Sequence, residues 1–351
     1  MAAACTSAPT SSGGSGEDIE ATAAAGIRPV DDVPADVPQD VVDAARDEVA
    51  ADPSPFVYYE GNPEDQIAKV FAAFKAEYPF VSELTHVRLA VRDLAPRIDQ
   101  ESRAGARTAD VALLADDGAQ ELDSRGQLLH MDWEAAGIAP GLVTTPYAVV
   151  TTAGVFTFIS NRNELPSPPK SWDDWLDGDL AGKVTLWSQA VPFAALVPVW
   201  GVEKTQDYVR DLVAEVHPTL SDTPWVPAQN VAAAEGALTI NAYHTALPAV
   251  NSGAPIEVVL PDPTPVSLVY ASVPKAAKHP KVAQLFIAWL NTQSGAKAYE
   301  DATGRGNPLI PTTDTAEMLR GHTISAWTPQ EAKKLGQNIV DLTAILRGGG
   351  V

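Results

Sequence analysis

Cysteine is almost absent from this sequence, in which Cys5 is the single example among 351 residues. A lone cysteine forms no intramolecular disulfide and no thiolate metal cluster, and one so near the N-terminus is no buried catalytic thiol. Long apolar runs are also missing: nowhere do about 18 apolar residues follow one another, so no segment is expected to span a bilayer. The remaining composition, 45% hydrophobic and 20% charged, is globular, and the length allows two ordinary domains with their own cores.

Basic residues are scarce as well, with 24 Lys and Arg against 45 Asp and Glu and a formal net charge of −21. Binding to nucleic acid needs clustered Lys and Arg to neutralise phosphates. The sequence has no such cluster, so nucleic acid is not expected as a partner. The acidity is a solubility property and carries no information about the charge of a ligand.

The common catalytic signatures are absent too. There is no G-x-S-x-G, no H-E-x-x-H and no P-loop, and the six histidines have no metal-ligand spacing. The segment GRGNPL at Gly304 has two glycines at dinucleotide-binding spacing, but it lacks the third and follows no expected strand. Scattered carboxylates can pair in any fold, but we expect no enzyme activity, no cofactor and no resident metal.

The N-terminus reads MAAACTSAPTSSGG, with small residues directly before Cys5. This pattern resembles the end of a bacterial lipoprotein signal, whose cysteine is acylated, although the charged and apolar regions of a signal peptide are missing. An Ala-rich tail with an incidental cysteine is the alternative. Residues 1–50 are therefore expected to form a lipoprotein N-terminus and a flexible tether, apart from a short helix around 41–49.

Strand and helix patterns alternate from residue 55 onward. A β-rich run over 55–59 precedes a helix with an apolar face from Ile67 to Phe74, for which Asn62 is the expected N-cap. The next elements are a strand around 86–91, a helix over 94–103 and a buried strand over 109–114. This alternation is typical of parallel α/β structure.

The second half of the chain shows a similar alternation after a change of pattern. Residues 147–159 are β-branched and aromatic, and we interpret them as a strand that crosses between lobes. Another α/β unit runs over 183–240, and a returning strand is expected over 266–270. A helix over 279–290 carries its large apolar residues on one face.

Five stretches between about residues 56 and 310 belong together. They are FVYYEGNPEDQIAKVFAAFKAEYP, RAGARTADVALLAD, FTFISNRNELPSPPKSWDDWLDGDLAGKVTL, AEGALTINAY and ASVPKAAKHPKVAQLFIAWLNTQSGAKAY. In this order and spacing they resemble the extracellular solute-binding proteins of bacterial ABC transporters. The resemblance is to the ferric-ion-binding-like subfamily (family 1) of the type II periplasmic binding protein class. Each stretch alone has low specificity, whereas five in order are specific.

This resemblance implies a two-lobed α/β fold of the type II periplasmic binding protein class, with a ligand cleft between lobes joined by crossing strands. The first lobe is expected over 52–148 plus 264–345 and the second over 149–263. The implied function is the substrate-binding component of an ABC importer, which captures a small solute by lobe closure and delivers it to a membrane permease. A ligand sensor of the same fold is an alternative.

The resemblance also implies where the protein acts. We expect a monomer outside the cytoplasm, lipid-anchored through Cys5 to the outer face of the cytoplasmic membrane, or else periplasmic.

The segment INAYH aligns with the family phrase in which an asparagine precedes two adjacent tyrosines that bind ferric iron. The resemblance therefore implies ligand contacts for Asn241, Tyr243 and His244. Phenolates suit ferric iron, but His244 replaces the second tyrosine, and Pro63 stands where ferric members can carry a histidine ligand. We favour a small polar or charged organic ligand; ferric ion or another metal complex is the alternative. A half-buried loop pair is the structural alternative for Tyr243 and His244.

Further candidates follow from the rule that open parallel sheets bind ligands beyond the carboxyl ends of their strands. They are Tyr59, Glu60 and Asn62 at the first strand-to-helix turn, Arg92 and Asp116 after the second and third strands, and Asn161, Ser188 and Gln189 at strand ends in the second lobe. Neighbouring residues on a strand face opposite sides, so at most one of Tyr58 and Tyr59 points into the cleft. Packing, capping or surface pairing is the alternative role of each candidate.

Overall fold

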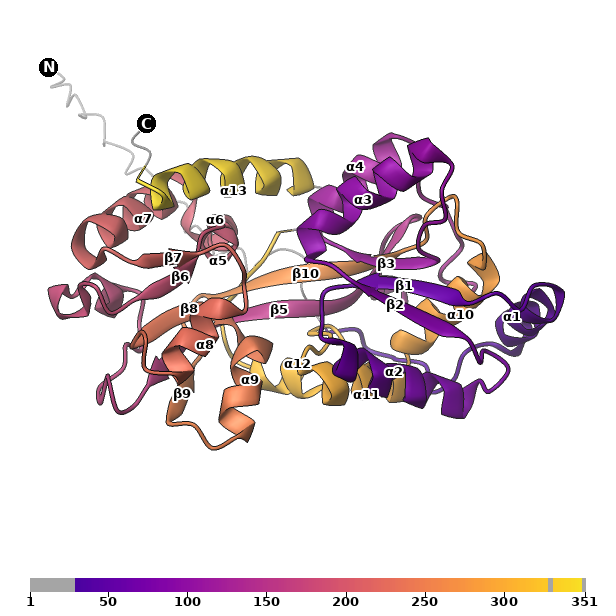
Figure 1. Cartoon of the computed structure of the whole chain (residues 1–351), viewed down its shortest axis with the longest axis horizontal. Coiled ribbons are helices and arrows are strands. Elements are labelled where there is room, and N and C mark those ends of the chain that lie inside the picture. Colours follow the sequence, from indigo (N-terminus) through magenta and orange to yellow (C-terminus); the bar gives the residue numbers. More distant parts are fainter. Residues whose placement is uncertain (1–28, 328–330, 349–351) are drawn as a thin grey trace, which may run out of the picture.

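The computed structural model describes residues 29–327 and 331–348, and Cys5 lies outside them. Figure 1 shows two α/β lobes side by side, with strands β5 (Ala148–Asn161) and β10 (Thr264–Ser272) running from one lobe into the other. The predicted fold class is confirmed. Within the described residues, no helix has the length and apolarity that crossing a bilayer requires.

Three parallel strands begin the sheet of the first lobe. They are Phe56–Glu60 (β1), Leu84–Arg88 (β2) and Val111–Leu114 (β3), and the helices that follow them are Glu64–Glu77 (α2), Val91–Ala104 (α3) and Asp116–Ser124 (α4). β1 lies in the middle and pairs in parallel with both β2 and β3. Parallel neighbours need a crossover, which α2 and α3 provide, so the predicted alternation of strand and helix is confirmed.

Strand β5 is shared by both lobes. Its first half pairs antiparallel with β10, and its second half pairs antiparallel with β8 (Leu238–Ala242) and β9 (Ile256–Val259). All 14 residues of β5 are buried. β10 also pairs antiparallel with β3, which gives the strand order β2-β1-β3-β10-β5-β4, with β4 at Val143–Thr145.

The second lobe is completed by a parallel pair of short strands, β6 (Thr185–Trp187) and β7 (Thr219–Ser221). Its helices are Val191–Ala194 (α5), Val197–Trp200 (α6), Val202–Val216 (α7), Val226–Ala232 (α8) and Tyr243–Asn251 (α9). Single turns of 3-10 helix lie at Asp173–Leu176 and Gly178–Leu180 here, and at Pro140–Leu142 in the first lobe. Trp175, Phe193 and Leu212 lie in the second-lobe core, which is separate from the first-lobe core around Phe286.

Helix α1 (Gln39–Ala51) belongs to the first lobe rather than to a tether. It packs on α10 (Pro280–Leu290), where the Glu48 carboxylate accepts hydrogen bonds of 2.9 Å from the backbone N–H groups of Lys281 and Val282. Three valines upstream of α1 are buried in the same core. The short helix expected around 41–49 is present as α1, but residues 29–50 do not form a tether, because this polar segment places its few apolar side chains against the first lobe.

The C-terminal helix joins the other lobe. After α11 (Gln293–Thr303), α12 (Asp314–Met318) and β11 (Ile324–Ser325), which pairs with β10, helix α13 (Ala332–Leu346) contacts α5 and α7 of the second lobe and also α4 of the first. The indole N–H of Trp327 donates to the carbonyl of Ala194 at 2.8 Å. The predicted extent of the first lobe, to residue 345, therefore differs from the structure, because the apolar face of α13 lies in the second-lobe core.

Replacing Leu342 by alanine tests the packing of α13. Leu342 is fully buried in the second-lobe core. Leu342→Ala removes apolar contacts and leaves a cavity, so we expect the free energy of unfolding to fall by roughly 2–5 kcal/mol. Val340 on the same helix is 63% exposed, and Val340→Ala should change that free energy by less than about 0.5 kcal/mol. Urea unfolding measures both, and small losses for both variants would contradict this packing.

Candidate functional site

The turn after β1 holds a hydrogen-bonded cluster of buried polar side chains. Glu60 accepts a hydrogen bond of 2.6 Å from the backbone N–H of Asn62 and one of 3.3 Å from the Tyr299 hydroxyl. The Asn62 side chain donates to that hydroxyl at 2.9 Å. Asn62 is therefore not the N-cap of α2: Pro63 occupies that position, without a side-chain cap, because the Asn62 amide faces Tyr299 on α11.

The two tyrosines of β1 face opposite sides, as alternation on a strand requires. The Tyr59 side chain packs against Leu94 of α3, and the Tyr59 hydroxyl donates a hydrogen bond of 3.1 Å to Glu101 of the same helix. Tyr58 lies on the same side as Glu60, with its hydroxyl buried and without a hydrogen-bond partner among the described residues. In this structure the side chain of Tyr59 is packed against α3, and the ligand contact predicted for it stays a prediction.

The β8–α9 turn supplies the residues of the INAYH segment. Asn241 is buried, and its side chain bonds to the Pro224 carbonyl at 2.6 Å and to the N–H of Ala242 at 2.8 Å, so it fixes the turn. Tyr243 and His244 begin α9 and are half-buried. The His244 ring meets Trp225 edge-on, with 5.4 Å between ring centroids. Burial, with a smaller contribution from the Arg305 charge, holds the pKa of His244 well below its usual value, so the imidazole is neutral at pH 7.

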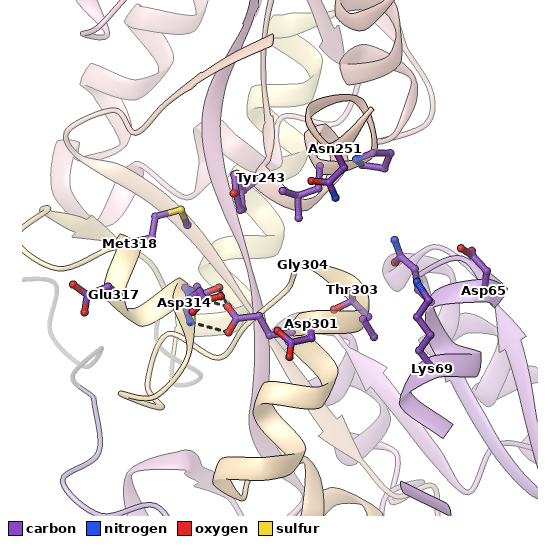
Figure 2. Close-up of a pocket in the computed structure, with 16 residues that line it drawn as sticks. Asp65, Lys69, Tyr243, Asn251, Asp301, Thr303, Gly304, Asp314, Glu317 and Met318 are labelled. Atoms are coloured by element: carbon purple, nitrogen blue, oxygen red, sulfur yellow. Dashed lines mark hydrogen bonds between the residues drawn. The ribbon is translucent and has the colours of Figure 1, made fainter. Parts of the chain in front are cut away.

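A cavity of about 850 Å³ opens beside this turn (Figure 2). Its walls come from α9 of the second lobe and from α2, α11 and α12 of the first. The lining residues are Asp65, Gln66, Lys69, Tyr243, Leu247, Pro248, Asn251, Glu300, Asp301, Ala302, Thr303, Gly304, Asp314, Thr315, Glu317 and Met318. The volume lies within the roughly 300–1,000 Å³ that small-molecule sites occupy. Of the residues predicted from sequence to contact a ligand, Tyr243 is the one that lines this cavity.

Carboxylates dominate the exposed wall of the cavity. Asp65, Asp301, Asp314 and Glu317 are exposed, against the single exposed lysine Lys69. Glu300 differs from these four because it is buried, and its carboxylate accepts hydrogen bonds of 2.6–2.8 Å from Asp314 and Thr315. It therefore serves the fold rather than a solute.

Arg92 and Asp116 belong to α3 and α4, which lie on the other side of β5 and β10 from α9 and α12 (Figure 1). Arg92 forms an ion pair with Asp117. Asp116 borders a void of about 10 Å³, together with Trp327 and Leu335, and a space of this size holds at most one water. Neither residue lines the cavity of about 850 Å³, and the ligand contacts predicted for them stay predictions.

Asn161, Ser188 and Gln189 are not brought into the cavity. The Asn161 side chain donates to the Val231 carbonyl at 2.9 Å and accepts from the N–H of Asn163, which stabilises the turn after β5. The Ser188 hydroxyl donates to Asp222 at 2.9 Å and accepts from Arg347. Gln189 is half-buried, and its side-chain oxygen has no hydrogen-bond partner among the described residues. These residues lie at strand ends as expected, Asn161 and Ser188 bond to protein groups rather than facing the cavity, and the ligand contacts predicted for all three stay predictions.

Two residues near the cluster were missed from the sequence, Tyr299 and Arg305. Tyr299 sits on α11 and joins Glu60 to Asn62. Arg305 follows α11 in the GRGNPL segment. Its positive charge acts to lower the pKa values of Tyr58, Tyr299 and His244. The two glycines beside Arg305 were the available signal, because they mark a backbone that approaches other groups closely. In the part of the chain that the structure describes, no three His, Cys, Asp or Glu side chains are grouped to hold a metal ion.

The family of bacterial extracellular solute-binding proteins matches residues 69–320, which is more than half of the chain. The chain belongs to this family, whose members are the solute-binding components of ABC transporters. A search of curated proteins gives no match.

Solved structures of periplasmic binding proteins share the fold. AfuA from Actinobacillus pleuropneumoniae, with fructose-6-phosphate bound, has a TM-score of 0.70 and 19% identity over 84% of this chain and 98% of AfuA. Iron-bound HitA from Pseudomonas aeruginosa has a TM-score of 0.66 and 20% identity over 83% and 99%. The spermidine/putrescine-binding protein PotD from Streptococcus pneumoniae has a TM-score of 0.63 and 13% identity over 84% and 99%. Because these proteins differ in ligand, the likeness establishes the fold alone.

The stability contributed by Asp116 should depend on pH. Burial is the main cause that raises the pKa of its carboxyl from 3.8 to about 7; the Asp117 charge acts in the same direction and the Tyr270 hydroxyl opposes it. Between these two pH values the folded state keeps a proton that the unfolded state loses, so stability falls as pH rises through this window. Asp116→Asn removes this titration and should become more stable relative to wild type from pH 4 to pH 7, by up to about 4 kcal/mol.

Urea unfolding at several pH values measures this difference. Asp207→Asn, on the exposed surface of α7, is the control for loss of one carboxylate. If the two variants keep a constant offset from wild type across the range, Asp116 does not titrate as expected.

Proposed function

We propose that this chain captures a small polar or charged organic solute in the cavity between α9 and the helices α2, α11 and α12, and passes it to a membrane permease. The cavity of about 850 Å³ with walls from both lobes carries the proposal. A solute held there touches both lobes at once, as capture by lobe closure requires. Membership of the solute-binding family supports transport as the purpose of capture.

Closure follows from the way the lobes are joined. Strands β5 and β10 run through both lobes, so small changes of twist in these strands move α9 toward or away from α2 and α11. A solute that contacts both walls binds the closed form more tightly than the open form, and this difference in affinity shifts the equilibrium toward closure. The permease then distinguishes the loaded protein by its shape.

An organic solute is favoured over ferric iron by the donors that are present. Tyr243 is the single tyrosine that lines the cavity, and its neighbour His244 stacks edge-on against Trp225. Burial also raises the pKa of Tyr58 and of Tyr299 well above the usual value, which disfavours the phenolates that a ferric ion needs.

A solute screen tests the cavity. At 100 times its dissociation constant a solute adds about 2.7 kcal/mol to the free energy of unfolding, which a thermal-shift assay detects. Amino acids, sugar phosphates, carboxylic acids, polyamines, neutral sugars and ferric citrate form the screen, and we expect an organic solute to bind. Asn251→Trp narrows the cavity and should weaken the best solute at least about tenfold.

Asn163→Trp is the matched control, since Asn163 is exposed in the turn after β5 and does not line the cavity. Equal affinity of both variants for the best solute would place its site elsewhere. If no class in the screen binds, capture of an organic solute is wrong, and tight binding of ferric citrate alone would reverse the preference for an organic ligand.

We also propose that Cys5 is lipidated and anchors the protein on the outer face of the membrane. The small residues before Cys5 support this proposal, together with membership of an extracellular family. Mass spectrometry of protein from its native cells should find a diacylglyceryl group on the sulfur of Cys5, and Cys5→Ser should release the protein from the membrane fraction. An unmodified Cys5 peptide in membrane-derived protein would contradict the anchor.

A further inference from the structure

The side chain of Arg305 is buried without a partner. It is 7% exposed, and within residues 29–327 and 331–348 its guanidinium makes no hydrogen bond or ion pair; its Nε in particular is fully enclosed. The backbone of the same residue is well fixed, because its N–H donates to Thr303 at 3.1 Å and its carbonyl accepts from Thr152 on β5 at 2.8 Å. The position of Arg305 is therefore set by the fold, whereas the hydrogen-bonding capacity of its guanidinium is unused.

An unpaired buried charge is unfavourable by several kcal/mol, and arginine cannot avoid this by losing its proton. The groups that sense the Arg305 charge do not neutralise it. Burial raises the pKa of Tyr58 and of Tyr299, and burial lowers that of His244, so all three are uncharged at pH 7. The carboxylate of Glu60 is engaged by Asn62, Tyr299 and the His86 ring, whose Nε2 lies 3.1 Å away.

Arg305 lies where the two lobes join. Gly306 accepts a hydrogen bond of 3.1 Å from Ala153 on the crossing strand β5. Gly304 has a φ of +70°, and a Cβ on it would lie 2.0 Å from Leu247 and 3.5 Å from the Cβ of His244. Glycine is thus required where α9 of the second lobe meets this segment. The charge of Arg305 acts on Tyr58 and Tyr299 of the first lobe and on His244 of the second.

We propose that the transported solute carries a carboxylate or phosphate group, and that the guanidinium of Arg305 binds this oxyanion. The proposal rests on capture of the solute between the lobes. A guanidinium presents a planar fork of N–H donors that matches two oxygens of a carboxylate or phosphate. Arg305 does not itself line the cavity but adjoins its wall, which includes Thr303 and Gly304 directly before it in the chain.

The remaining charges of the cavity narrow the class of solute. Four exposed carboxylates surround the cavity against one lysine, but Asp301 and Asp314 lie beside Lys297, and Glu317 pairs with Arg320. Their repulsion of a second anionic group on the solute is therefore weakened, although it still favours a solute whose other end is neutral or positively charged. An amino acid, an ω-amino acid or a phosphate monoester fits this description best, whereas a polyamine, which has no oxyanion, does not fit it.

Isothermal titration calorimetry with defined probes tests the proposal. The probes are γ-aminobutyrate and a set of amino acids for the carboxylate arm, glycerol 3-phosphate and fructose 6-phosphate for the phosphate arm, and succinate, spermidine and glucose as counter-probes. We expect at least one probe from the first two arms to bind wild type. Arg305→Met should weaken it about 100-fold or more, and Arg305→Lys, which keeps the charge but loses the fork, should weaken it about tenfold.

Arg210→Met is the matched control, since Arg210 forms an exposed ion pair with Asp207 on α7, and its affinities should equal those of wild type. The ligand-free proteins give a second readout. Arg305→Met removes an uncompensated buried charge, so its Tm should equal or exceed that of wild type. A clearly lower Tm would mean that the guanidinium is satisfied within the protein, and would overturn the proposal.

The outcomes separate this inference from capture itself. If an oxyanion probe binds Arg305→Met as tightly as wild type, or if spermidine or glucose binds wild type while every oxyanion fails, the role of Arg305 is wrong and capture of an organic solute stands. If Asn251→Trp also leaves the affinity of the bound probe unchanged, the cavity is wrong as well.

Discussion

Backbone pairing along β5 is the constraint on which both lobes depend. Its first half bonds to β10 and its second half to β8 and β9, and all of it is buried. The turn that starts α9 comes directly from β8, and the segment around Arg305 bonds to Thr152 and Ala153 of β5. Both walls of the cavity are therefore anchored to one strand, and their relative position changes only when that strand bends or twists.

The polar groups near this strand fall into two kinds. Glu60, Asn62 and Tyr299 bond to one another and form a fixed buried cluster in the first lobe. Arg305 and the Tyr58 hydroxyl have no such bonds in the described residues. Satisfied buried groups make a site rigid, whereas an unsatisfied buried charge raises the energy of the empty site and increases the gain when a complementary group arrives. We therefore attribute the rigidity of this region to Glu60, Asn62 and Tyr299, and the affinity for the proposed solute to Arg305.

The fold was predictable from sequence because its signals are local. Alternating strand and helix patterns gave parallel β1, β2 and β3, and five family-like stretches gave the two-lobed arrangement. Helix α10 shows the limit: one apolar face was expected, but α1 and α11 pack on it in addition to the sheet, so nearly all of it is buried. The extent of the tether was mispredicted for the same reason: a short helix was expected at α1, but its packing on α10, more than 200 residues away, was not.

The site was predictable only in part, because contacts between distant segments decide it. Tyr243, which lines the cavity, could be found from the INAYH segment, whereas Asp116 is covered by residues around Trp327 and α13 that no local pattern connects to it. Arg305 stands in a short loop, where the two flanking glycines indicate a closely packed backbone but do not show that the Arg305 side chain is buried. Because α13 touches both α4 and α7, the lobes stay in contact along that edge. Any separation must then widen the opposite edge, between α2 and α9, so solute is expected to enter and leave through a single mouth whose rim is negatively charged.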